Sequence, residues 1–375
     1  MDQSYLNREH KTHSWPIPRL VDEAIRKDPS LRGLVQVSPY LSPNLSSGIH
    51  QVFSHRNFPT LSKDAYCNLA LGLRLASRLL GAKHLLPWWI HTAYGTRLYK
   101  GKTDKGEDEF YLEKTENYTR EHARMTRCAI NNLAMHVKWS FDVYLGDEFS
   151  YARTTLVKNQ EPQPLHGLFK KSQPHYRCQV FLHDQYRIFA EHSYLEAPLE
   201  ERLRFSFSFA ATIVHELTHC FAALRRGFLK PEELFDIKDP DCELGWSWES
   251  WAFGGVILAS DQKLCPPGHL VWNTWTEEVN KKHSGGYYRQ LVPMDWIAGW
   301  FREEMWTGGE QLSLPQKDLV FWERSRRRVT LVEDNRKVGS KRPFAALWDT
   351  KVEYEEYKQE DFVVQQSKRL CRRSS

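Results

Sequence analysis

The stretch PLEERLRFSFSFAATIVHELTHCFAALRRG (198–227) predicts a long helix that carries the residues on which the function depends. A proline followed by two acidic residues is typical of a helix start. Two arginines followed by a glycine are typical of a helix end. Most residues between these ends are apolar, which predicts a helix buried on most of its sides.

Within this helix, the HELTH motif (215–219) indicates a metal site. His215 and His219 are four residues apart, so both project from one face and can bind one ion. Two histidines and a glutamate are costly to bury without partners, and Zn²⁺ would supply one, since it binds neutral imidazole and leaves a position open for water. Glu216 would act as the general base toward that water. The alternative is a pair of core histidines bonded to backbone or carboxylate groups.

A third ligand is needed to complete such a site. In the HExxHxxGxxH class the ligand follows on the same segment, but Ala222 and Arg225 occupy the relevant positions and exclude that class. A carboxylate from a second, downstream helix is the other common solution. We prefer Glu249 over Glu243, because Glu249 begins the apolar face of a helix predicted after Gly245, and the other would hydrogen-bond one of the histidines. The full set of candidates is Glu232, Glu233, Asp236, Asp241, Glu243 and Glu249.

HELTH followed by SWESWAFGG (247–255) resembles the gluzincin metallopeptidases over residues 198–256. The ExxxFGG portion is similar to the third-ligand helix of clostridial neurotoxin light chains, and the spacing around Glu249 is similar to that of the HExxH aminopeptidases. The resemblance implies a zincin-like fold, with His215, His219 and Glu249 as zinc ligands and Glu216 as general base. It also implies a substrate-binding edge strand before the zinc helix, for which YRCQVFLHDQY (176–186) has the right position and composition.

A donor besides zinc is needed to stabilise a tetrahedral intermediate. Those toxins use an Arg-x-x-Tyr downstream, and this chain has none after Glu249. The segment KHSGGYYRQL (282–291) offers Tyr287 and Tyr288 beside two glycines, so one of these tyrosines is the candidate. A surface loop with an aromatic plug is the alternative interpretation of this segment.

The remaining patterns predict an α+β fold, with a small twisted sheet on the HELTH helix. Apolar spacing predicts helices over 61–82 and 119–140, and β-branched and aromatic residues predict strands over 151–157 and 176–189. We expect an irregular segment over 1–60, a catalytic domain over 61–310 and a charged, basic segment over 311–375.

Composition limits the possible environments of the protein. The net charge of +5 is small for 375 residues, and the basic runs near the C-terminus are typical of solvated surface, so no nucleic-acid partner is expected. Seven cysteines without a CxxC pair favour free thiols. There is no apolar signal-like start and no uncharged apolar run long enough to span a membrane. These features predict a cytoplasmic protein.

Taken together, the sequence predicts a zinc-dependent hydrolase, a metallopeptidase that acts on a peptide or amide bond. One alternative is a zinc enzyme that acts on a small non-peptide substrate, which a closed tryptophan-walled pocket would favour. Another is a non-catalytic binding protein with the same fold. An open groove along the edge strand would favour the peptidase. The sequence does not indicate an oligomeric state.

Overall fold

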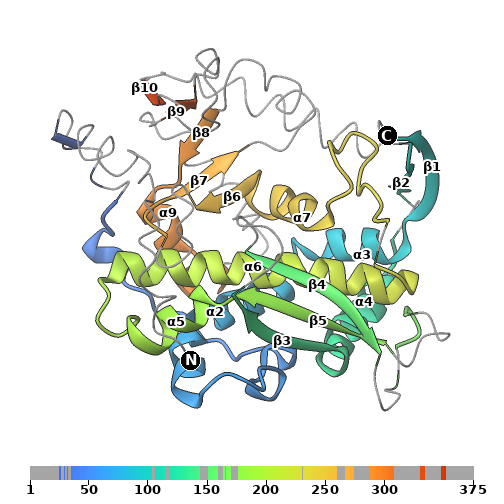
Figure 1. Cartoon of the computed structure of the whole chain (residues 1–375), viewed down its shortest axis with the longest axis horizontal. Coiled ribbons are helices and arrows are strands. Elements are labelled where there is room, and N and C mark those ends of the chain that lie inside the picture. The colour runs from blue at the N-terminus through green and yellow to red at the C-terminus, as the bar shows by residue number, and fades with distance from the viewer. Residues whose placement is uncertain are drawn as a thin grey trace.

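The structure is a computed structural model. It describes residues 35–103, 106–114, 118–143, 151–158, 164, 166–169, 176–229, 231–259, 267–273, 288–307, 330–333 and 348–351, together with 25, 26, 29 and 32. Figure 1 shows the arrangement of helices and strands around one long horizontal helix. Most of the predicted C-terminal segment 311–375 lies outside the described residues, as does most of the first half of segment 1–60.

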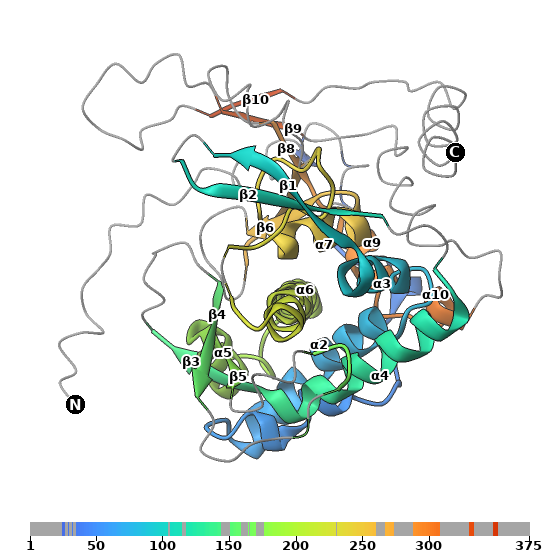
Figure 2. The same ribbon diagram turned by 90° about the vertical axis from the view of Figure 1, so that its right-hand side faces the viewer.

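The long central helix is α6 (Leu199–Arg226), which matches the helix predicted from its end signals. Gly227 follows it in the left-handed conformation with φ of 86° and donates its N–H to Ala223 O at 2.7 Å, which ends the helix. Figure 2 looks along α6 and shows other elements on every side of it. Its apolar side chains are buried, and they join the main hydrophobic core. The predicted burial of this helix on most of its sides is therefore confirmed.

A three-stranded sheet lies against one side of α6, in the order β3 (Val137–Asp142), β5 (Tyr176–His183), β4 (Ala152–Lys158). Strand β5 pairs in parallel with β3 and in antiparallel with β4. The prediction that 176–186 forms the edge strand is therefore wrong, because β5 is the central strand and β4 lies at one end of the sheet. Order along the chain does not determine order within a sheet.

Two predicted elements are each divided in the structure. The helix predicted over 119–140 is α4 (Arg120–His136), capped by Thr119, and its last residues belong to strand β3. The strand predicted over 176–189 ends at His183, and α5 (Gln185–His192) follows. In both cases pairing within the sheet determines the boundary, since β3 pairs along its whole length with 178–183 of β5.

The other helices and strands enclose α6. Helix α2 (Lys63–Gly81) begins after the predicted cap Ser62, whose hydroxyl accepts the Ala65 N–H at 3.2 Å. The remaining elements are η3 (Pro39–Leu41), η4 (Gln51–Phe53), η5 (His55–Asn57), α3 (Leu86–Tyr94), β1 (Thr96–Lys102), β2 (Asp108–Glu113), α7 (Leu244–Phe253), β6 (Val256–Ala259), β7 (Leu270–Asn273), β8 (Tyr288–Leu291), α9 (Met294–Gly299), α10 (Glu304–Thr307), β9 (Thr330–Glu333) and β10 (Trp348–Lys351). The chain thus combines helices with small sheets, as the predicted α+β class requires.

Within the part of the chain that the structure describes, α6 is also the one helix long and apolar enough to cross a bilayer. Of its most apolar window, 94% is buried inside the protein. That burial is the property of a core helix in contact with protein on all sides. The described cysteines Cys67, Cys128, Cys178, Cys220 and Cys242 are free, as predicted.

Candidate metal centre

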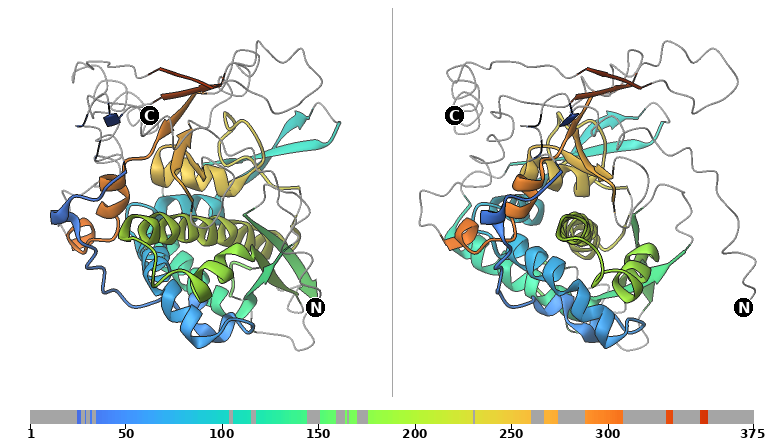
Figure 3. Two further views of the ribbon diagram at one scale, coloured as in Figure 1. Left: turned by 60° about the vertical axis from the view of Figure 1, so that its left-hand side comes forward. Right: turned by 90° about the vertical axis from the view of Figure 1, so that its left-hand side faces the viewer.

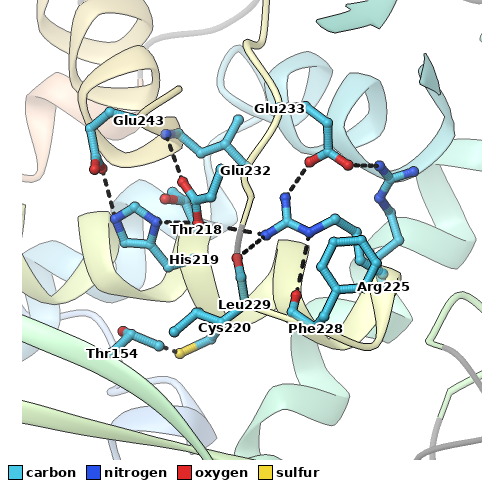
Figure 4. A network of polar contacts seen from close by, with 12 residues as sticks. Thr154, Thr218, His219, Cys220, Arg225, Phe228, Leu229, Glu232, Glu233 and Glu243 are labelled. Carbon is cyan, nitrogen blue, oxygen red and sulfur yellow. Dashed lines mark hydrogen bonds and ion pairs between the residues drawn. The ribbon is translucent and has the colours of Figure 1, made fainter. Parts of the chain in front are cut away.

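Helix α6 presents His215 and His219 toward helix α7, as their spacing predicts, and Glu216 toward strand β4. One nitrogen of each histidine and one carboxylate oxygen of Glu216 lie within 4.8 Å of one another. The segment that joins α6 to α7, residues 227–243, returns beside these side chains, and we call it the strap. It brings two further carboxylates, Glu232 and Glu243, to His219 (Figure 4).

Glu243 faces the Nε2 atoms of both histidines. Its Oε1 lies 3.3 Å from Nε2 of His215 and 2.8 Å from Nε2 of His219. The same oxygen accepts the Gly245 N–H at 3.3 Å, which caps helix α7. Two imidazole nitrogens and one carboxylate oxygen therefore converge, which is the donor set of a two-histidine, one-glutamate zinc site.

The other ring nitrogens of the histidines face two different glutamates. Nδ1 of His215 lies 2.8 Å from Oε1 of Glu249, and Nδ1 of His219 lies 2.8 Å from Oε1 of Glu232. Metal-binding histidines commonly donate their second N–H to a carboxylate, which orients the ring. Glu249 thus has the place of a residue that orients a ligand, and Glu243 has the place of the ligand itself. This geometry reverses the preference for Glu249 that the helical periodicity indicated.

Both orienting carboxylates are themselves held by backbone groups. Oε2 of Glu249 accepts the Ile257 N–H at 2.9 Å, at the start of β6. Oε2 of Glu232 accepts the Leu244 N–H at 3.2 Å, at the start of α7. Because each carboxylate is fixed at both oxygens, each imidazole is held in one orientation.

Glu216 is fixed from the opposite side by strand β4. The hydroxyl of Thr154 donates to Oε2 of Glu216 at 2.6 Å. Both residues are buried, so water competes little for this hydrogen bond. One carboxylate oxygen is thereby occupied, and the orientation of the other is set relative to the histidines.

Close packing explains why the first turn of α7 contains Gly245. A Cβ atom at this position would lie 2.2 Å from Nε2 of His215 and 2.3 Å from its Cδ2. Any larger side chain would therefore displace the His215 ring. The glycine allows α7 to approach α6 closely enough for Glu243 to reach both imidazoles.

The charges of the cluster favour a cation at its centre. Burial alone would lower the pKa of His215, but hydrogen bonds to Glu243 and Glu249 and their charges raise that pKa to about 10. Burial likewise opposes protonation of His219, yet Glu232 and Glu243 raise its pKa well above the usual value. Two protonated imidazoles carry the same charge as one divalent ion, so such an ion would replace protons without adding charge to this buried site.

A cavity of about 490 Å³ opens onto these side chains. One wall comes from α6, and the others from the beginning of β4, from α7 and from β6. Arg153 and half-exposed Trp246 also line it. The rest of the lining consists of Tyr151, Ala152, Thr154, Ser208, Ala211, Thr212, His215, Glu216, His219, Leu229, Glu232, Cys242, Glu243, Glu249, Ile257 and Leu258. The described residues thus place the two histidines, Glu216 and Glu243 at the surface of this cavity.

The other candidates from the sequence have different positions. Glu233 faces arginines, and Asp241 accepts the Cys242 N–H at 2.7 Å, so neither is directed at the histidines. Asp236 accepts the Lys238 N–H at 3.0 Å within the strap. Tyr287 lies outside the described residues, and Tyr288 is described only as backbone in β8. Their predicted role as oxyanion donors stays a prediction.

Three residues of the candidate site were not singled out by the sequence interpretation. Thr154 is an ordinary threonine in a strand, and nothing nearby in the sequence relates it to Glu216. Glu232 was one of several acidic candidates, and no pattern distinguished it from Glu233. Gly245 was recognised only as the residue before a predicted helix. All three depend on contacts between segments distant in the chain, which periodicity does not detect.

Asp239 in the strap gives the fold a predictable dependence on pH. Burial raises the pKa of its carboxyl to about 7, and the charge of Asp236 adds to this effect. Between pH about 4 and 7 the unfolded chain releases this proton while the folded chain keeps it, so this contribution to stability is lost as pH rises. We expect Asp239→Asn to be about 1–2 kcal/mol more stable than the natural chain at pH about 8, with no gain at pH about 4.

Urea unfolding across this pH range, with a chelator present, measures the effect. The amide oxygen of asparagine can still accept the Asp236 N–H, which Asp239 accepts at 3.1 Å. Asp241→Asn, at an exposed acid of the same strap, is the matched control. A gain in stability of the same size at pH about 4 and at pH about 8 would contradict the raised pKa of Asp239.

Helix α6, the strap and helix α7 together form the candidate site. Helix α6 supplies two imidazoles and one carboxylate, and the strap and α7 supply three further carboxylates. The residues match the donor chemistry of zinc, and their positions separate ligands from orienting groups. Comparisons of this chain with models of protein families, with curated proteins and with solved structures returned no match.

Proposed function

We propose that this protein is a zinc-dependent hydrolase with a zincin-like, gluzincin-type centre, and that it cleaves a peptide or amide bond. One observation carries the proposal: Nε2 of His215, Nε2 of His219 and Oε1 of Glu243 converge, with the carboxylate of Glu216 beside them. The resemblance of HELTH to the zinc motif of that class agrees with this arrangement. We place the activity in the cytosol, on the basis of the free cysteines among the described residues.

In this proposal His215, His219 and Glu243 hold the zinc ion, in place of the set with Glu249. Glu249 and Glu232 orient the two imidazoles from their Nδ1 sides. Tetrahedral zinc sites in hydrolases use three protein ligands and keep the fourth position for water or substrate. The described carboxylates and imidazoles are sufficient for this coordination.

Zinc would supply a Lewis acid that polarises the substrate carbonyl and lowers the pKa of water at the site. Glu216 would then accept a proton from the attacking water and return it to the leaving nitrogen. Thr154 supports this role because its hydroxyl occupies Oε2 of Glu216 and leaves Oε1 as the oxygen that exchanges protons. The threonine thus keeps the base in one orientation through both transfers.

The position of β4 favours an extended peptide as substrate. This strand lies at one end of its sheet and runs antiparallel to β5, and residues 151–154 line the cavity. A strand in this place can pair with a bound peptide through main-chain hydrogen bonds. It therefore takes the role for which the sequence suggested 176–186.

A small non-peptide substrate is the second candidate. Half-exposed Trp246 lines the cavity beside Glu243 and would offer an aromatic surface to a small ligand. Among the described residues, the tryptophans at 248 and 251 do not line the cavity, so its described lining offers one tryptophan and not a tryptophan wall. The third candidate is a non-catalytic binding protein with the same centre. Only an activity assay distinguishes it from the two enzymes.

Metal analysis and a peptide assay together test the proposal. The purified full chain, dialysed against zinc and then buffer, should retain about one zinc per chain, as expected for a site with three protein ligands. The His219→Ala variant should retain none. The zinc-loaded chain should cleave members of a quenched fluorescent peptide library, and o-phenanthroline should abolish cleavage. Zinc retention no greater than that of His219→Ala would refute the metal centre, and zinc without cleavage would favour the other two candidates.

A further inference from the structure

The strap has a second set of attachments beside the metal centre. Glu232 turns toward His219, while the adjacent Glu233 turns the opposite way and is fully buried. Glu233 forms an ion pair with Arg226 at the end of α6, and its Oε1 lies 3.6 Å from Nη2 of Arg225 (Figure 4). The same Oε1 lies 3.2 Å from Nε of Arg97. A buried carboxylate is costly unless it is paired, so these guanidinium groups determine where Glu233 lies.

Arg226 links the two neighbouring glutamates. Its NH2 group lies 3.6 Å from Oε1 of Glu232 and donates to the carbonyl of Leu229 at 2.7 Å. The Nε group of the same side chain donates to the Phe228 carbonyl at 3.4 Å. One guanidinium thus contacts the backbone of the strap, Glu233 and the carboxylate that orients His219.

The β1–β2 hairpin holds the same part of the strap from outside. Leu112 of β2 donates its N–H to the Leu234 carbonyl at 2.9 Å, and Leu234 donates its N–H to the Phe110 carbonyl at 2.8 Å. Arg97 extends from β1, and its guanidinium carbon lies 3.3 Å from the centre of the Phe110 ring. Figure 3 shows the hairpin on the α7 side of α6, away from the three-stranded sheet. The hairpin therefore contacts the strap at Glu233 and Leu234, the two residues that follow Glu232.

We infer that the β1–β2 hairpin sets the zinc affinity of the centre, and that Arg97 is a positioning residue that acts through Glu233 and Glu232 on His219. The inference rests on the proposed zinc centre and adds an element that the zinc motif does not contain. Arg97 is only about one-third exposed and its partner Glu233 is fully buried, so this ion pair is shielded from solvent. Without Arg97, Glu233 and Leu234 would be held less firmly, and Glu232 could shift relative to the imidazole.

Zinc affinity measured by competition with a chromophoric chelator tests this inference. We expect Arg97→Gln to raise the zinc dissociation constant about 3–10-fold, less than the 10–100-fold typical of a direct partner of a ligand. Arg97→Lys keeps the charge and should restore part of the affinity. Lys102→Gln is the matched control, because it removes one charge from the same hairpin at an exposed pair with Asp108. Its zinc affinity should equal that of the natural chain.

A double-mutant cycle separates positioning from general loosening of the fold. If Arg97 acts through Glu232, adding Arg97→Gln to Glu232→Gln should weaken zinc binding no further. The visible spectrum of the cobalt-loaded protein should change in Arg97→Gln and not in Lys102→Gln. Additive effects on zinc affinity, or a spectrum and affinity equal to those of the control, would overturn the inference. Absence of zinc binding by the natural chain would instead refute the proposed function, so the two failures are distinguishable.

Discussion

Replacing Glu216 with glutamine is expected to lower the turnover number about 10²–10⁴-fold while zinc binding remains. The amide cannot accept a proton from water, yet it matches the carboxylate in size. Its oxygen can still accept the hydroxyl of Thr154, which lies 2.6 Å from Oε2 of Glu216. Steady-state cleavage of the best library peptide and zinc content of the same preparation measure the two properties side by side.

Two further variants make this test specific. Glu201→Gln removes the same charge from the start of α6, far along the helix from His215, and should leave turnover unchanged. Thr154→Val keeps the proposed zinc ligands and removes the hydroxyl that bonds Glu216 and lies 3.9 Å from Sγ of Cys220, so a smaller loss of about 3–30-fold is expected. Cleavage by Glu216→Gln at the rate of the natural chain would exclude Glu216 as the base.

The second large effect concerns zinc binding, and it distinguishes Glu243 from Glu249 as the third ligand. Glu243→Ala should lose zinc, because it removes the oxygen that lies 2.8 Å and 3.3 Å from the Nε2 atoms of His219 and His215. Glu249→Ala should keep zinc with a dissociation constant about 10–100-fold higher, since it removes a group that orients His215 through Nδ1. Equilibrium dialysis with radioactive or chelator-buffered zinc gives both constants.

The cap at the start of α7 requires a control in this experiment. Glu243 accepts the Gly245 N–H, and loss of such a cap costs about 1 kcal/mol by itself. Glu243→Gln keeps an oxygen for this hydrogen bond and loses the ligand charge, so it should resemble Glu243→Ala in zinc affinity and the natural chain in thermal stability. Zinc retention by Glu243→Ala together with its loss in Glu249→Ala would restore Glu249 as the ligand.

The candidate metal centre shows which features of a site a sequence pattern can predict. The helical spacing of His215 and His219 was sufficient to predict that both lie on one face of a buried helix, because a helix repeats every 3.6 residues whatever surrounds it. The same kind of argument placed Glu249 on the inner face of α7, and it is buried there. It could not predict which ring nitrogen Glu249 would meet, since that depends on the rotation of the imidazole.

The errors in secondary structure have a related cause. Residues 137–140 continued the apolar pattern of the preceding helix, and 185–189 continued the aromatic pattern of the preceding strand. In the structure the first become strand and the second become helix. Strand β3 begins where its residues start to pair in parallel with β5, and β5 ends where this pairing stops. Both partners are distant in the chain, so a local window does not contain the information.

Local sequence was therefore enough to identify the long helix, its ends and the three residues on it that we propose as part of a metal centre. These features depend on backbone geometry and on hydrogen bonds within a few residues. The contact of Glu243 with both imidazoles, the contacts of Glu232 and Glu249 with the Nδ1 atoms, the edge position of β4 and the pairing of Thr154 with Glu216 all required the tertiary structure. Each of them depends on how close two separately folded segments come and on which atoms then face each other.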